Sequence, residues 1–85
     1  MDAKPEEIAQ DLEARIQRIP DTQARRDLMR MLGVAKRILV ELDQERVRCR
    51  RLQKPTHAYL ELHKKAVQQL DCVEKNLLMA TLMFS

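Results

Sequence analysis

Two long stripes of apolar residues dominate the sequence, one between Ala24 and Leu52 and one between Tyr59 and Phe84. In both, apolar positions recur at alternating steps of four and three residues, the pattern of a long helix packed against another helix. The first stripe comprises Ala24, Leu28, Met31, Ala35, Ile38, Leu42, Glu45 and Cys49, and the second Tyr59, His63, Ala66, Leu70, Val73, Leu77, Ala80 and Phe84. The pattern predicts an all-α fold built on two long helices.

Residues 53–55 separate the two stripes and contain a proline that cannot continue the first helix. Thr56 follows as a candidate N-cap of the second helix. A chain that reverses at this point forms an antiparallel helical hairpin, coiled-coil-like, in which the two stripes face each other in mirror order. The predicted pairs include Met31 with Leu77 and, as the one polar pair, Glu45 with His63.

A shorter amphipathic helix is predicted before Pro20. Pro5 and the two acidic residues that follow it suit the first turn of a helix. Apolar residues then recur at helical spacing: Ile8, Leu12, Ile16 and Ile19. We therefore divide the chain into an N-terminal amphipathic helix or arm (residues 1–20) and a helical hairpin domain (residues 21–85). The short helix either packs back on the hairpin or serves as a docking arm.

The first long helix is expected to begin at Asp21 or Thr22, either of which suits an N-cap. It contains the only glycine of the chain, Gly33. Glycine inside a helix costs about 1 kcal/mol relative to alanine. Gly33 therefore either marks the close approach of another backbone or is a tolerated surface residue.

More apolar side chains lie at the end of the hairpin away from the turn than one stripe can bury. Residues 77–84 are apolar on every side of a helix, and residues 28–34 on nearly every side. A contiguous apolar patch marks a protein–protein surface on a small domain, and methionines make such a surface adaptable. The predicted partner-binding residues are Met29, Leu32, Gly33, Leu78, Met79, Leu82 and Met83. The alternative is that the helix over residues 8–19 covers this end and closes a three-helix bundle.

Composition agrees with one small helical domain, since 45% of the 85 residues are hydrophobic and 34% are charged. The formal net charge is +3, and a possible basic patch precedes the turn, formed by Arg46, Arg48, Arg50, Arg51 and Lys54. Acidic residues one turn earlier and the dipole of the helix make a solvated, self-paired helix end the simpler interpretation. Weak nucleic-acid binding through this patch remains an alternative.

No group of residues predicts catalysis, so we expect no enzyme, no cofactor and no metal. A single glycine excludes the glycine-rich loops that bind phosphate, and His57 and His63 lack the i,i+4 spacing of metal ligands. Cys49 and Cys72 would lie about 20 Å apart along the hairpin and are expected to be free thiols. No apolar run approaches the roughly 18 residues of a membrane span, and the first residues lack a signal-peptide pattern. We expect a cytoplasmic protein.

The turn and the second arm carry a family resemblance. The turn is short and polar, the arm opens on Tyr59, and residues 64–78 read KKAVQQLDCVEKNLL. Over roughly residues 22–83 the chain resembles the small co-chaperones of the type III secretion needle subunit (the YscE/PscE/SsaE family). The resemblance implies that the protein binds and stabilises a tetratricopeptide-like chaperone in the cytoplasm, and that together they keep the needle subunit soluble before export. The alternative use of the same patch is a homodimeric helical-bundle adaptor.

Overall fold

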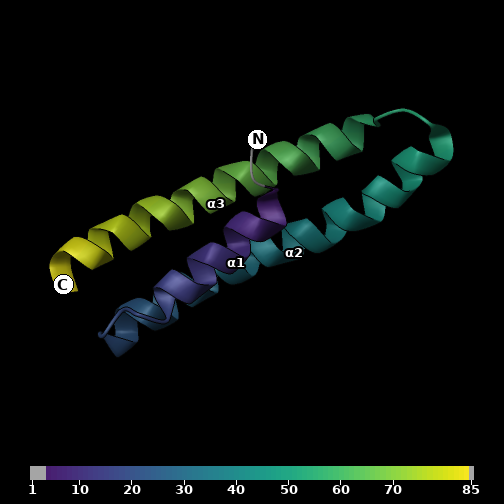
Figure 1. The fold of residues 1–85 in the computed structure, drawn as a ribbon. Coiled ribbons are helices and arrows are strands. Elements are labelled where there is room, and N and C mark those ends of the chain that lie inside the picture. Colours follow the sequence, from purple (N-terminus) through teal and green to yellow (C-terminus); the bar gives the residue numbers. More distant parts are fainter. Residues whose placement is uncertain (1–3, 85) are drawn as a thin grey trace.

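The computed structural model describes residues 4–84, which form three α-helices: α1 (Pro5–Ile16), α2 (Thr22–Leu52) and α3 (His57–Phe84). The all-α class is confirmed for these residues. Figure 1 shows α3 folded back alongside α2, with α1 lying along the pair. The described chain measures 48 × 25 × 16 Å along its principal axes. Residues 1–3 of the predicted N-terminal arm lie outside the described residues.

The helices begin where the sequence predicts, because each start has a local stabilising feature. Pro5 occupies the first turn of α1, where its missing N–H removes no hydrogen bond. The carboxylate of Asp21 accepts a hydrogen bond of 2.8 Å from the N–H of Ala24 and caps α2. The hydroxyl of Thr56 accepts one of 3.0 Å from the N–H of Tyr59 and caps α3 in the same way.

The end of α2 is closed by a residue in the left-handed region, Gln53, with φ of 59°. The N–H of Gln53 donates to the carbonyl of Arg50, and the N–H of Lys54 donates to the carbonyl of Cys49, both at 3.2 Å. These two bonds form the motif that commonly ends helices, although glycine usually supplies its left-handed residue. The motif turns the chain out of α2 just before Pro55.

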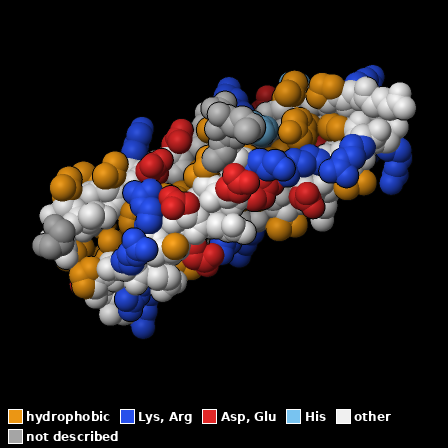
Figure 2. Space-filling view, viewed as in Figure 1, with side chains coloured by type: hydrophobic (Ala, Val, Ile, Leu, Met, Phe, Trp, Pro, Cys, Tyr) orange, Lys and Arg blue, Asp and Glu red, His pale blue; other side chains and the backbone are white. Residues whose placement is uncertain are grey.

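The core lies where the three helices meet. On α3 the buried residues are those of the predicted stripe, namely Ala66, Leu70, Val73, Leu77 and Ala80. On α2 they are Leu28, Leu32, Ala35, Leu39 and Leu42. Leu32 and Leu39 lie outside the predicted stripe, and α2 buries this wider face because it contacts α1 as well as α3. Figure 2 shows further hydrophobic side chains that remain on the outside toward both ends of the molecule.

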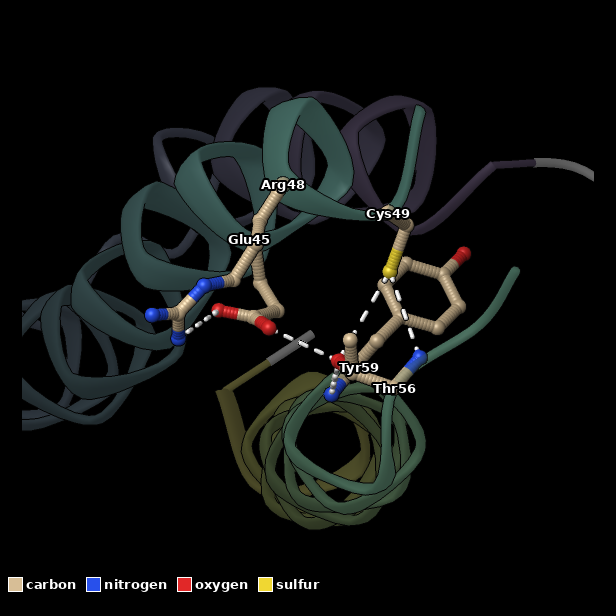
Figure 3. Close-up of polar contacts among 5 residues, drawn as sticks. All are labelled: Glu45, Arg48, Cys49, Thr56 and Tyr59. Atoms are coloured by element: carbon tan, nitrogen blue, oxygen red, sulfur yellow. Dashed lines mark hydrogen bonds and ion pairs between the residues drawn. The ribbon is translucent and has the colours of Figure 1, made fainter. Parts of the chain in front are cut away.

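The start of α3 is bound to α2 through Thr56, which lies between Glu45 and Cys49 in Figure 3. Its hydroxyl donates a hydrogen bond of 2.7 Å to Oε1 of Glu45, and its N–H donates one of 3.4 Å to Sγ of Cys49. The predicted mirror order would have placed Thr56 level with Leu52. The helix α3 therefore begins between one and two turns further back along α2 than predicted.

This displacement makes the predicted register wrong. Glu45 binds Thr56 instead of facing His63. The carbonyl of Met31 accepts a hydrogen bond of 3.1 Å from the side-chain amide of Gln69, where a residue about two turns further along α3 was expected. Periodicity identifies the buried face of a helix, but it leaves the axial position of the helix to contacts such as those of Thr56.

Gly33 does not mark a close approach of another backbone, so that hypothesis is wrong. A Cβ atom placed on Gly33 would meet no atom within 4 Å. The residue lies inside α2 and is partly buried, with open space beside it.

We therefore expect Gly33→Ala to raise the free energy of unfolding by about 1 kcal/mol, because alanine loses less backbone entropy in a helix and meets no steric obstacle here. Urea denaturation followed by circular dichroism measures the change. Ala14→Gly, at an exposed position of α1, is the reverse control and should lower stability. A destabilised Gly33→Ala variant would contradict the open space seen at this position.

Candidate protein-binding surface

Exposed apolar surface is concentrated on the last turns of α3. The exposed fractions are 53% for Leu78, 61% for Met79, 76% for Leu82 and 70% for Met83, and we call these four residues the α3 strip. Their spacing places Leu78 above Leu82 and Met79 above Met83, in two adjacent rows on the helix. The strip presents ridges of the kind that pack against another helix.

The strip is exposed because it lies on the side of α3 opposite the buried residues Val73, Leu77 and Ala80, and therefore outside the contacts of α3 with α2 and α1. The apolar face of this helix and of the segment after it is buried, through Ala9, Leu12, Ile16 and Ile19. Near its beginning Glu6 contacts Arg46 of α2, and near its end Arg15 lies 3.7 Å from Glu74 of α3. The N-terminal segment thus packs back on the two long helices, as one of the two predicted alternatives has it. It does not cover the outer side of α3, where the strip lies.

The structure divides the seven predicted partner-binding residues into two groups. Leu78, Met79, Leu82 and Met83 are exposed, whereas Leu32 is fully buried beside α1 and contributes nothing to the surface. Met29 and Gly33 are partly buried, and Sδ of Met29 lies 3.8 Å from the side-chain amide of Gln17. The prediction that the apolar end of α2 forms an open patch with α3 is therefore wrong at Leu32, because the N-terminal segment covers that face.

A pocket of about 460 Å³ adjoins the strip, between the segment that follows α1 and the last turns of α3. Its apolar lining includes Ile19, Pro20, Leu78 and Phe84, and its cationic lining consists of Arg15 and Arg18. Sequence reasoning missed this pocket, since it depends on where α1 lies. The available signal was the alternation of arginines with the apolar residues that end the short helix.

The predicted basic patch is divided by an ion pair that crosses the fold. Both terminal nitrogens of the Arg46 guanidinium donate hydrogen bonds to the carboxylate of Glu6. Arg48 lies 3.9 Å from the carboxylate of Glu45 (Figure 3). The remaining members, Arg50, Arg51 and Lys54, are exposed. Nucleic-acid binding by the full patch is weakened as an interpretation, because Arg46 is engaged in holding α1.

The contact between Glu6 and Arg46 affects the titration of the carboxylate. Burial alone would raise the pKa of Glu6, but the hydrogen bonds and charge of Arg46 outweigh it, so that the pKa of Glu6 is lowered from 4.5. The same hydrogen bond raises the pKa of Arg46 above its ordinary value. Glu6 is therefore more acidic in the folded chain than in the unfolded chain.

Other chemistry is sparse in the part of the chain that the structure describes. Cys49 and Cys72 are free thiols, as predicted. Residues 4–84 contain no cluster of three or more His, Cys, Asp or Glu side chains arranged to hold a metal ion. None of the three helices is both long and apolar enough to span a membrane. The α3 strip and its pocket are the strongest candidate site among the described residues.

Comparison with protein-family models, with curated proteins and with solved structures gave no match.

We expect Glu6→Gln to lower the free energy of unfolding at neutral pH by about 0.5–1 kcal/mol, the range of partly exposed ion pairs. A carboxylate whose pKa is lowered by folding stabilises the fold above its ordinary pKa and loses this contribution as pH falls through the folded value. The difference between wild type and Glu6→Gln should therefore disappear as the pH falls below about 4.5.

Thermal unfolding between pH 7 and pH 3 measures this difference. Glu7→Gln is the matched control, because Glu7 is exposed and has no ion pair among the described residues. Equal pH profiles for the two variants would rule out a stabilising contact between α1 and Arg46.

Proposed function

We propose that this chain is a non-enzymatic protein-binding module, an antiparallel and coiled-coil-like helical hairpin braced by α1, whose α3 strip docks on a helical protein partner. The observation that carries the proposal is the exposure of Leu78, Met79, Leu82 and Met83 even though α1 already packs on the two long helices. Four large apolar side chains in one short segment form a patch typical of interaction surfaces.

The resemblance of residues 22–83 to the needle co-chaperones gives the proposal a specific form. In that form the protein is cytoplasmic, binds and stabilises a tetratricopeptide-like chaperone, and helps to keep a type III secretion needle subunit soluble before export. A tetratricopeptide-like protein is built of helix pairs, so its surface offers the helical grooves into which the rows of the α3 strip fit.

The free energy available from burying the α3 strip is that of a specific interface of moderate affinity. Burial of a large apolar side chain contributes about 1.5–3 kcal/mol, and the strip residues are already partly covered. Their complete burial would contribute on the order of 4–8 kcal/mol gross. Association costs about 4–15 kcal/mol, so the strip needs further contacts with the partner around it.

The same strip supports a second candidate, a homodimeric helical bundle in which two copies cover each other. The exposure of the strip favours this candidate as much as it favours a different partner. The mass of the purified protein in solution, alone and with a candidate partner, distinguishes the two.

We expect the double variant Leu78→Glu with Leu82→Glu to bind its partner, or a second copy, at least a hundredfold more weakly, because two carboxylates would have to be buried without partners. Its helical content when free should match that of wild type, since both positions are exposed. Isothermal titration with the candidate chaperone, together with light scattering of the free protein, measures these outcomes.

Two controls separate docking from folding. Val40→Glu with Val47→Glu introduces the same charge at two exposed apolar positions of α2 and should leave binding unchanged. Leu70→Glu places a carboxylate in the core and should unfold the chain. If the strip variant and Leu70→Glu lost helix alike, the strip would be part of the core, and the proposed function would be wrong.

A further inference from the structure

The end of the molecule that carries the α3 strip is cationic. Residues 15–30 and 74–84 together contain six basic and three acidic side chains. Figure 2 shows acidic side chains over the middle of one face, with Lys and Arg toward its two ends. The apolar strip is thus flanked by positive charge.

The acidic groups at this end are already engaged. Asp21 caps α2, and Asp27 accepts a hydrogen bond of 3.0 Å from the side chain of Gln23. Glu74 lies 3.7 Å from Arg15. Arg15 also lies 3.5 Å from Asp11, so nearby carboxylates compensate part of the positive charge, that of Arg15 above all.

Arg18 is the cation best placed to meet a ligand on the strip. It is exposed, and it has no ion pair or side-chain hydrogen bond within residues 4–84. Arg18 and Arg15 both line the pocket that Leu78 and Phe84 also line. A side chain inserted beside Leu78 would consequently have guanidinium groups on one flank only, the flank formed by α1 and the segment after it.

We infer that the partner presents an amphipathic helix with an acidic flank: its apolar residues cover the α3 strip, one of them enters the pocket beside Leu78, and carboxylates on the side toward α1 pair chiefly with Arg18, beside Arg15. This inference rests on the proposed function and adds the chemistry of the partner. Carboxylates are the natural complement, because arginine binds them with two parallel hydrogen bonds.

A second copy of the chain fits this surface less well. In a symmetric dimer through the strip, the same patch of each copy meets its counterpart, and this would bring the two arginine-rich ends together. Like charges at an interface oppose association. The charge thus favours an acidic partner over self-association at this site.

The test is a display selection that uses the full chain as the target. The library consists of helical peptides with leucines at i, i+4, i+7 and i+11, and with both flanking rows randomised among Glu, Gln and Lys. We expect clones enriched on wild type to carry Glu along one flank. The variant Arg15→Gln with Arg18→Glu should lose this preference or turn it toward Lys.

Fluorescence anisotropy with one enriched peptide then measures how much the two arginines contribute to the affinity. We expect its Kd to rise about five- to twentyfold for Arg15→Gln with Arg18→Glu at low salt, with a smaller change at high salt, as for exposed ion pairs. Arg50→Gln with Arg51→Glu is the matched control, with the same change of charge at exposed positions near the other end of α2, and should leave the Kd unchanged. Thermal unfolding of both double variants checks that α1 remains docked.

The outcomes separate this inference from the proposed function. If the peptides bind wild type but not Leu78→Glu with Leu82→Glu, and show no flank preference, the inferred acidic flank is wrong. The proposed docking on the α3 strip would still hold. Peptides that bind wild type and that strip variant equally would overturn both. The inference would also be wrong if the preference for Glu depended on Arg50 and Arg51. It would be wrong, too, if wild type formed a stable dimer that Leu78→Glu with Leu82→Glu disrupts and the arginine variants do not.

Discussion

The structure depends on one packing interaction of limited length, that of α1 and the segment after it against α2 and α3. The 12 residues of α1 span about 18 Å, whereas the 31 residues of α2 span about 46 Å. Within that length Leu12 and Ile16 are fully buried, together with Leu32 of α2. Because α1 contacts α2 as well as α3, its position decides that Leu32 and Leu39 of α2 belong to the core.

Polar contacts orient this packing more than they drive it. Three ion pairs join α1 to the long helices: Glu6 with Arg46, Glu13 with Lys36 at 2.9 Å, and Arg15 with Glu74 at 3.7 Å. Their side chains are all partly exposed, so each contributes about 1 kcal/mol or less. Burial of the α1 face is worth more. The ion pairs help to set the axial position of α1 along the two long helices.

Much of this architecture could be predicted from the sequence, because helical periodicity and capping are local properties. The stripe on α3, the caps at Asp21 and Thr56 and the position of the turn follow from such rules. The register of α3 and the burial of Leu32 could not be predicted, since both depend on contacts between segments far apart in the chain. For the same reason the pocket of Arg15 and Arg18, which requires the position of α1, was not foreseen.

The division between core and strip also determines what binding at the strip would require of the fold. To expose Leu32 and Leu39 for a partner, α1 would have to leave, at the cost of its apolar contacts and its three ion pairs. The α3 strip is already exposed, so a partner can cover it without any such rearrangement. Little ordering cost then opposes association there, and the energy of burying the strip is available for affinity. We therefore expect α1 to stay docked when a partner binds, supporting the binding surface without opening or closing over it.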